Sequence, residues 1–516
     1  MEKRFHNRLN FGLSFLISFL LLIPLLWYGL GEDQGLYSYS AWVWRNWGHA
    51  PYAYCFDQNF PGIFLIHYFV QSVFGESVTA FRFFDLIWQT ATALMVYLVT
   101  AKIFKKSISG LLASAFYSIS YVNLGPWNTG QRDGFLLLTY LICFWLFMEE
   151  KQEKRALIRA LISGLLLGFA FMLKPVAAIA GLIFLALIFK TEKRKYLSSL
   201  VFLAACPLPM LLVIAYYWRI GALKDMYEAL ILFNFKVYSS ALVFDLKGMI
   251  NGITLKSYLL SNCLILLGGI LLYIQRKKIP DDSRVYATWL LLIFLGSYLG
   301  YLAQSKYYFY QQAPVWGLLC LLGAGGWSLT IDFIDEKWPI QIKTRTFIIT
   351  FLLILCTIFL IKPFIHEYLV KALRVSPREG QRLYPFYDVC LQAGNYVDAH
   401  SKPGDKLQVW GGGAIVNYLA RKESPSRFSS TLYFILRPGP NRRAPLQKNF
   451  GQELLDAARK DPPLYFIVEL LPHPVFGIES DKQVLVADYP EIWAFVTANY
   501  SLETKISFME IYRRKQ

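Results

Sequence analysis

Long apolar runs alternate along the chain with short basic segments. Runs of about twenty apolar residues are long enough to cross a bilayer as helices. They can be placed at 11–30, 80–101, 107–124, 133–149, 157–173, 175–190, 197–217, 257–275, 286–303, 313–331 and 346–363. This pattern predicts a polytopic α-helical membrane protein with about eleven spans. No small-x-small cleavage site precedes Glu32, so we interpret the first run as a retained span.

Basic residues indicate how the spans are oriented. They collect in alternate loops, around Arg8, Lys105, Lys154, Lys193, Lys277 and Lys343. The positive-inside rule places such loops in the cytoplasm, so the N-terminus is predicted to be cytoplasmic. An odd number of spans then puts the C-terminal part outside a bacterial inner (plasma) membrane. The formal net charge of +17 follows from this topology and does not indicate a nucleic-acid partner.

The segment between the first two runs is predicted to be the first outer loop, residues 31–79. Aromatic residues between Tyr37 and Trp47 form one short amphipathic segment, and residues 63–74 form a second. Aromatic side chains of this kind lie at the membrane interface. We therefore expect outer-face amphipathic helices in the membrane plane, with a turn at Asp57 between them.

The composition changes near residue 375, which predicts a transmembrane domain at 1–375 and a soluble extracytoplasmic α/β domain at 376–516. Two predicted strands, 407–410 and 464–470, lie among polar helical stretches at 384–400, 450–460 and 489–499. Residues 500–514 alternate and end as a final strand. Gly411-Gly412-Gly413 lacks the Lys-Ser/Thr of a phosphate loop and is interpreted as a turn. A disulfide between Cys55 and Cys390, the two cysteines expected outside, is possible but not favoured.

Two acids follow the first apolar run directly. If that run is a helix ending here, its dipole disfavours the negative charges of Glu32 and Asp33. An acid in an unfavourable place favours a functional role, so Asp33 is the first candidate. Asp57 precedes Asn59, Pro61 and Gly62, where an Asx turn or a helix cap explains the acid equally well.

Cations gather at the outer ends of other spans. Arg132 and Asp133 open the fourth span, where charged side chains are costly unless they are paired or face a wet cavity. Lys174 begins the sixth span, and Lys306 precedes the tenth. Lysines at span ends often snorkel to water, yet topology does not require cations on the outer side. Together the three cations would bind an anionic group such as a lipid phosphate.

The order of these features resembles the GT-C superfamily of membrane glycosyltransferases. The similar branch contains bacterial relatives of protein O-mannosyltransferases and of the lipid A aminoarabinose transferase. Its Asp-Glu-Gly-Leu-Tyr motif is present as Asp33-Gln34-Gly35-Leu36-Tyr37, and its Asp-Asn-Lys-Pro-Pro-Gly motif as Asp57-Gln58-Asn59-Phe60-Pro61-Gly62. Gly130-Gln131-Arg132-Asp133, the Lys174-Pro175 hairpin, Tyr489-Pro490-Glu491 and Tyr512-Arg513-Arg514 are also typical. The resemblance extends over nearly the whole chain.

The resemblance implies an inverting glycosyltransferase that works on the outer face. Asp33 would be the general base that deprotonates an acceptor hydroxyl as it attacks the anomeric carbon. The donor would be a polyprenyl-phosphate-linked sugar, and the acceptor a glycolipid, a cell-surface glycan or a protein. Neither a nucleotide sugar nor ATP is implied.

The same resemblance implies roles for the other polar residues. The departing phosphate gathers charge, which Arg132, Lys174 and Lys306 would stabilise. Supporting or acceptor-side roles fall to Glu32, Gln34, Asp57 and Asp133. The acids Glu32, Asp33, Asp57 and Asp133 could also bind a divalent cation, although no spacing requires a metal.

Two departures from the family pattern leave alternatives open. Gln34 replaces the second acid, for which Glu32 could substitute, and Asn59 replaces a lysine. Either another cation binds the phosphate, or the enzyme is weak or inactive. A non-catalytic assembly protein that keeps the fold is therefore one alternative. A lipid-linked glycan transporter or flippase is another; it would predict ionisable residues in mid-span and an internal repeat, and the pattern shows neither.

Overall fold

The structure, a computed structural model, describes residues 2–148, 155–239, 262–337, 384–436, 444–472 and 480–516. Its residues divide into two compact units. The first takes its described residues from Met1–Trp27, Arg82–Leu211 and Asp245–Arg374, and the second from Tyr28–Phe81, Leu212–Phe244 and Val375–Gln516. The predicted domain boundary at 375–376 lies outside the described residues.

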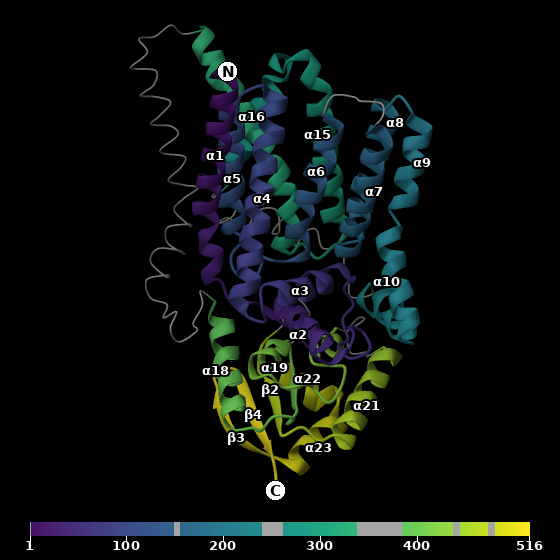
Figure 1. Ribbon diagram of the computed structural model, residues 1–516. Helices are drawn as coiled ribbons and strands as arrows, with labels where there is room; N and C mark the ends of the chain where they lie inside the picture. The colour runs from purple at the N-terminus through teal and green to yellow at the C-terminus, as the bar shows by residue number, and fades with distance from the viewer. Residues whose placement is uncertain (1, 149–154, 240–261, 338–383, 437–443, 473–479) are drawn as a thin grey trace. The chain divides into compact units, whose positions relative to one another are not determined.

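The first unit is helical (Figure 1). Its elements, two of which continue into the second unit, are α1 (Glu2–Leu22), η1 (Ile23–Trp27), α4 (Val78–Phe104), α5 (Ser107–Val122), η2 (Arg132–Phe135), α6 (Leu136–Met148), α7 (Ala156–Leu173), α8 (Ala177–Thr191), α9 (Lys195–Ala205), α10 (Leu208–Arg219), α14 (Cys263–Ile274), η5 (Arg276–Lys278), α15 (Asp281–Ala303), η6 (Phe309–Gln312) and α16 (Ala313–Lys337). Ten of the eleven predicted spans overlap these helices, and the eleventh, 346–363, lies outside the described residues.

Six helices in the described part of the chain are long and apolar enough to cross a membrane. They cover Arg8–Trp27, Val78–Phe104, Ala156–Leu173, Lys195–Arg219, Asp281–Ala303 and Phe309–Ile334. Shorter apolar helices include α5, α8 and α14. The first unit therefore has the composition of a multi-pass membrane bundle.

Helices of the first unit pack closely where glycines meet. α14 contacts α16, and α16 contacts α5, which in turn contacts α1. A Cβ at Gly268 would lie 2.3 Å from the carbonyl oxygen of Gly323, and one at Gly326 would lie 1.9 Å from that of Gly268. Only glycine permits this backbone approach of α14 to α16, as in small-residue contacts between membrane helices.

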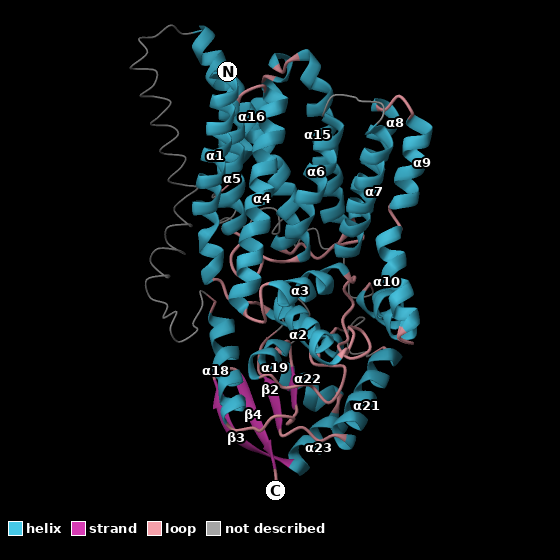
Figure 2. Ribbon diagram, in the orientation of Figure 1, coloured by secondary structure: helices cyan, strands magenta, loops and turns pink. Residues whose placement is uncertain are grey.

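The second unit combines short helices with one sheet (Figure 2). Its helices are α2 (Glu32–Trp47), α3 (Gly62–Val73), α11 (Leu223–Tyr227), the π-helix η4 (Glu228–Tyr238), α18 (Pro385–Ala399), α19 (Ala414–Ala420), α20 (Leu432–Ile435), α21 (Pro445–Lys460), α22 (Asp481–Asp488) and α23 (Pro490–Asn499). The two helices expected in the first outer loop are α2 and α3, which pack against each other.

The sheet has four strands in the order β1-β2-β4-β3. These are β1 (Leu407–Trp410), β2 (Tyr465–Glu469), β3 (Tyr500–Ile506) and β4 (Met509–Arg514). β1 pairs with β2 in parallel, with Val409 opposite Ile467, and the other two pairs are antiparallel. Every residue of β1 and β2 is buried, which explains why all of them are apolar except Gln408 and Glu469.

Residues 500–514 end in a strand, β4, as expected, but the segment as a whole is a β-hairpin because β3 precedes β4. Ser507, with φ of 53°, turns the chain between β3 and β4. A non-glycine residue in this left-handed region is uncommon, and the sequence there contains no Asn-Gly or Asp-Gly turn signal. β4 buries Met509, Ile511 and Tyr512, whereas Tyr500 is the only buried residue of the edge strand β3.

Candidate functional site

Glu32 and Asp33 are the first two residues of α2, not the last residues of the first span. The chain leaves α1 through η1, and a new helix begins after Gly31. The expectation that the helix dipole disfavours these acids is therefore wrong. At a helix N-terminus the dipole favours a negative charge and stabilises the ionised carboxylate. Both side chains are half-buried, so Asp33 keeps contact with solvent.

The side chain of Gln34 caps the N-terminus of α2. Its side-chain oxygen accepts a hydrogen bond from the Gly31 N–H over 3.0 Å, and the Gly35 N–H donates to the Gly31 carbonyl over 2.9 Å. Gln34 is fully buried. A glutamine is a usual residue for this capping contact and brings no charge into the interior. The capping contact thus explains why a glutamine occupies position 34, whether or not Gln34 also contacts substrate.

Two phenols interact electrostatically with the acids of α2. Burial, followed by the charges of Glu32 and Asp33, raises the pKa of Tyr384 above its usual value. Burial also raises the pKa of Tyr433, and the charges of Asp57 and Asp33 add to the effect. Both phenols therefore stay protonated and can donate hydrogen bonds. Neither was a candidate from the sequence, because they lie some 350 to 400 residues after Asp33.

Asp57 forms the turn that the sequence allowed. Its Oδ1 accepts a hydrogen bond from the Asn59 N–H over 2.9 Å, which is an Asx turn, and the residue is fully buried. Asn59 donates from its amide to the Tyr37 hydroxyl over 3.0 Å, and its carbonyl accepts from the Tyr52 hydroxyl over 2.8 Å. The asparagine in place of the family's lysine is therefore integrated into the packing around α2.

In the first unit, Lys174 and Asp133 form a buried ion pair. Lys174 Nζ lies 2.6 Å from Asp133 Oδ2, and the two side chains are 8% and 1% exposed. The ammonium also lies over the ring of Tyr310, 5.1 Å from its centroid. Asp133 begins the fourth apolar run and Lys174 ends α7, so the pair satisfies the requirement that charges at this depth be paired. The structure thus joins a predicted acceptor-side acid to a predicted phosphate ligand.

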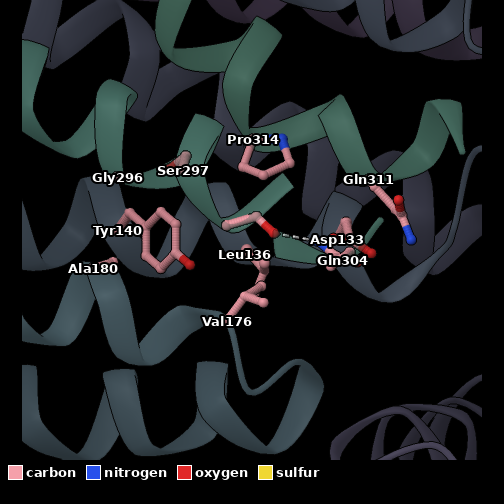
Figure 3. Close-up of a pocket in the computed structure, with 11 residues that line it drawn as sticks. Asp133, Leu136, Tyr140, Val176, Ala180, Gly296, Ser297, Gln304, Gln311 and Pro314 are labelled. Atoms are coloured by element: carbon pink, nitrogen blue, oxygen red, sulfur yellow. Dashed lines mark hydrogen bonds between the residues drawn. The ribbon is translucent and has the colours of Figure 1, made fainter. Parts of the chain in front are cut away.

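Asp133 also lines a pocket in the first unit (Figure 3). The lining residues are Asp133, Leu136, Tyr140, Val176, Ala180, Gly296, Ser297, Gly300, Gln304, Gln311 and Pro314. They come from η2, α6, α8, α15, η6, the start of α16 and the connections between them. The polar groups come from Asp133, Tyr140, Ser297, Gln304 and Gln311, and the other lining residues are apolar or glycine.

The other two predicted cations are half-buried at the ends of helices. Arg132 is the first residue of η2, next to Asp133. Lys306 lies between Ser305 and Tyr307, which have φ values of 52° and 55°. Two left-handed non-glycine residues around one lysine are unusual and store conformational strain. Such strain is found preferentially at functional positions.

A second buried charge pair was missed in the sequence. Arg82 and Asp85 are fully buried on α4, 3.4 Å apart. Arg82 also donates to the carbonyls of Pro126 and Thr129, while Tyr121 donates to Asp85 over 2.9 Å and accepts from the Gly130 N–H over 2.8 Å. The network fixes the loop that leads to Arg132 and Asp133. The sequence does contain a signal for this pair, because Arg82 and Asp85 are opposite charges three residues apart at the start of an apolar run.

A metal site does not follow from this arrangement. Among the described residues, no three His, Cys, Asp or Glu side chains come together in a group that could hold a metal ion. Cys55 and Cys390 are both buried free thiols.

The chain is similar to known proteins both in sequence and in fold. A family model described as dolichyl-phosphate-mannose-protein mannosyltransferase matches residues 58–218. The structure of ArnT from Cupriavidus metallidurans bound to undecaprenyl phosphate has a TM-score of 0.56 at 12% identity, covering 98% of this chain and 97% of ArnT. The resemblance to GT-C membrane glycosyltransferases is confirmed.

Other solved structures have the same GT-C fold. ArnT in the apo state has a TM-score of 0.55 at 13% identity, over 99% of this chain and 98% of that one. AglB from Archaeoglobus fulgidus, an archaeal oligosaccharyltransferase in complex with an inhibitory peptide and a dolichol-phosphate, has a TM-score of 0.53 at 13% identity, over 98% and 74%. No curated protein sequence matches the chain. The chain is thus a multi-pass membrane protein with the GT-C glycosyltransferase fold.

Proposed function

We propose that this protein is an inverting glycosyltransferase that moves a sugar from a polyprenyl-phosphate-linked donor to an acceptor hydroxyl. The acceptor is a glycolipid, a cell-surface glycan or a protein. ArnT was solved bound to undecaprenyl phosphate, and AglB in complex with a dolichol-phosphate. The shared fold, together with the family match, supports a lipid-phosphate donor for this chain.

The proposed reaction makes one bond and breaks one. The acceptor oxygen bonds to the anomeric carbon from the face opposite the phosphate, so the configuration inverts. The bond between the anomeric carbon and the phosphate oxygen breaks, and its electron pair leaves with the polyprenyl phosphate. Asp33 takes the proton of the attacking hydroxyl.

The observation that carries this proposal is the place of Asp33 in the first turn of α2. There the helix dipole favours its ionised form, and the side chain is only half-buried. A general base needs an ionised carboxylate and access to the acceptor. Glu32, Gln34 and Asp57 take supporting roles around it, since Gln34 and Asp57 fix the local backbone.

The leaving phosphate requires cationic partners. We assign them to Arg132, Lys174 and Lys306, of which Lys174 is already bound to Asp133. A phosphate that reaches Lys174 competes with the Asp133 carboxylate, so this lysine would discriminate against weakly charged ligands. The strained backbone on both sides of Lys306 supports a binding role for that residue.

Asp33→Asn tests the proposal. Membranes that contain the wild-type protein, supplied with radiolabelled polyprenyl-phosphate sugars, should transfer label to an endogenous acceptor. The variant should express normally and lose at least about a hundredfold in rate, because general-base catalysis contributes on this scale. Asp398→Asn, a change on the exposed last turn of α18, is the matched control. Full transfer by Asp33→Asn would remove Asp33 as the base.

The topology belongs to the same proposal. We propose eleven spans, with a transmembrane domain at 1–375 that carries the first outer loop at 31–79 and an extracytoplasmic α/β domain at 376–516. The N-terminus would be cytoplasmic in a bacterial inner membrane, in accordance with the positive loops. Labelling of single cysteines introduced at Ser501 and Lys193 with a membrane-impermeant maleimide tests this, after the native cysteines are replaced. Label on the first position and not on the second, in intact spheroplasts, is the expected result.

A non-catalytic protein with the same fold is the second candidate. Asn59 favours it, because this residue is hydrogen-bonded to Tyr37 and Tyr52 and carries no positive charge of its own. Such a protein would bind the polyprenyl-phosphate donor without consuming it. Donor binding by the purified protein, combined with no transfer under any acceptor condition, would favour this candidate over the enzyme.

A further inference from the structure

The start of α2 is held by residues from the C-terminal part of the second unit. A Cβ at Gly412 would lie 3.0 Å from the carboxyl carbon of Glu32, so the Glu32 side chain lies directly against the backbone of the glycine turn. One helical turn further, a Cβ at Gly35 would lie 2.4 Å from Cβ of Ile415 on α19. Before the helix, a Cβ at Gly29 would lie 2.6 Å from Cβ of Tyr387 on α18. The residues that make these three contacts, at positions 29, 32 and 35, lie on both sides of Asp33 in the sequence.

The glycine turn is itself organised by a buried acid. Glu469, the last residue of β2, is fully buried, and the N–H group of Gly412 donates to its carboxyl group over 2.8 Å. A Cβ at Gly411 would lie 2.2 Å from one carboxyl oxygen, and one at Gly413 would lie 2.1 Å from the other. The three consecutive glycines thus form a cradle that fits this carboxyl group. The turn predicted from the sequence is confirmed, and its reason is Glu469.

The other end of the turn is also fixed. Gly411, with φ of +137°, donates from its N–H to the Thr431 hydroxyl over 2.7 Å, and its carbonyl accepts from the Thr431 N–H over 2.9 Å. Gly412 therefore lies between two anchors, Thr431 and Glu469. The side chain of Glu32 lies against Gly412, which is bonded directly to Glu469 and follows the residue bonded to Thr431.

We propose that Glu469 is a positioning residue for the reaction: it fixes the Gly411–Gly413 turn, and the turn fixes the start of α2 and so the direction of the Asp33 carboxylate. This inference rests on the proposed role of Asp33 as the base. Glu469 acts through the hydrogen bond that it accepts from the Gly412 N–H, and not by contact with substrate. It also assigns to the C-terminal α/β unit a part in the chemistry of the first outer loop.

Two substitutions at Glu469 separate positioning from charge. Glu469→Gln keeps a side-chain oxygen that can accept from the turn, so its transfer rate should stay close to wild type. Glu469→Ala removes the acceptor, and kcat should fall about 10- to 100-fold with KM for the lipid donor unchanged, because misplacement of a catalytic group affects the rate more than binding. Gly412→Ala, which pushes on Glu32 from the turn and leaves Glu469 in place, should act in the same direction.

An activity-independent measurement accompanies the kinetics. Hydrogen exchange of the backbone amides of residues 28–40, followed by mass spectrometry on the full-length protein in detergent, should accelerate in Glu469→Ala and Gly412→Ala and not in Glu469→Gln. Glu503→Ala is the matched control: this glutamate lies on the edge strand β3, where it accepts from the Tyr396 hydroxyl over 2.6 Å. Thermal unfolding shows whether each variant is folded. If Glu469→Ala does not fold, the proposal is tested with Gly412→Ala instead.

The results distinguish the two proposals. Faster exchange with a lower kcat supports positioning. The inference is overturned if exchange at residues 28–40 is unchanged, if exchange rises without a fall in kcat, or if Glu469→Gln is as damaging as Glu469→Ala. Full activity of Asp33→Asn refutes the base and not the structural contact, which the exchange data report separately.

Discussion

Lys174 donates a hydrogen bond to Asp133 over 2.6 Å, and both side chains are almost completely buried. Removing one partner leaves the other charge buried without compensation, which costs about 3–5 kcal/mol for pairs of this kind. Lys174→Met and Asp133→Leu should therefore each lower the unfolding temperature strongly. The double variant should be more stable than either single variant.

Thermal unfolding of the purified protein in detergent measures this cycle. Lys105→Met provides the comparison, because the pair of Lys105 with Asp282 is exposed and should contribute little. Additive effects of the two substitutions would show that the pair does not interact in the folded protein. All three variants at the buried pair should also lose transfer activity.

Gln34 gives a second prediction about the start of α2. Gln34→Leu removes the acceptor of the Gly31 N–H and should destabilise the protein by about 1 kcal/mol. Gln34→Glu keeps the acceptor and restores the family's acidic residue, so α2 should remain intact. Hydrogen exchange at the Gly31 and Gly35 amides checks both outcomes. Equal exchange in Gln34→Leu and wild type would rule out the capping role.

Arg427 organises a cluster of aromatic rings in the second unit. Its guanidinium donates to Glu228 over 2.6 Å and to Glu453 over 2.7 Å, and it lies 5.2 Å from the ring centroid of Phe56 and 5.1 Å from that of Phe428. A lysine cannot reproduce the planar fork or the stacking. Arg427→Lys should therefore cost about 1–3 kcal/mol of unfolding free energy, although the charge is kept.

The matched control for this change is Arg459→Lys. Arg459 is exposed, and its nearest carboxylate oxygen, from Asp456, is 3.9 Å away. Its replacement should leave the denaturation midpoint unchanged. A midpoint for Arg427→Lys equal to that of the control would mean that the guanidinium geometry has no role in stability.

Glu469 makes stability depend on pH. Burial, followed by the charges of Asp481 and Glu32, raises the pKa of Glu469 above its usual value, against the Gly412 and Gly413 N–H groups, which lower it. Because the pKa of Glu469 is higher in the folded than in the unfolded protein, the protonated carboxyl group stabilises the fold. This contribution to the free energy of unfolding is complete below the unfolded-state pKa and is lost as pH rises through the folded-state pKa. Glu469→Gln does not titrate. Its stability relative to wild type should therefore increase with pH, by at most about 1.4 kcal/mol for each pH unit between the two pKa values.

Thermal unfolding of both proteins at pH 4.5 and pH 8 provides the comparison. Asp481, Glu32 and the thiol of Cys390 interact with Glu469 and are present in both proteins, so the difference reports the titration of Glu469 together with its interactions with these groups. A constant difference between the two pH values would mean that Glu469 titrates normally.

The helical part of the fold could be predicted because membrane spans depend on local hydropathy. Ten predicted ranges overlap helices, and both helices predicted between the first two apolar runs are present as α2 and α3. The break between α1 and α2 was placed incorrectly, since the apolar run continues to Leu30 although the helical geometry changes earlier, at Ile23. Gly29 and Gly31 were the available signals. The same oversight reversed the interpretation of the dipole at Asp33.

Individual residues of the candidate site could be predicted from local motifs, but the contacts between them could not. Short motifs pointed to Asp33, Asp133 and Lys174, but the pairing of the last two joins residues 41 positions apart and depends on helix packing. The contact of Glu469 with the glycine turn joins β2 to a loop 57 residues earlier. No local pattern encodes such distances, so the sequence predicts the turn without its cause.

The close contact of Gly412 with Glu32 has an evolutionary consequence. The two positions share one small volume: a side chain at position 412 would occupy the space of the carboxyl group at position 32. In a lineage of related chains, a larger residue at one position is tolerated only with a smaller one at the other. Positions 32 and 412, 380 residues apart, should therefore covary, and the first outer loop and the C-terminal part of the chain should be inherited together as a matched pair.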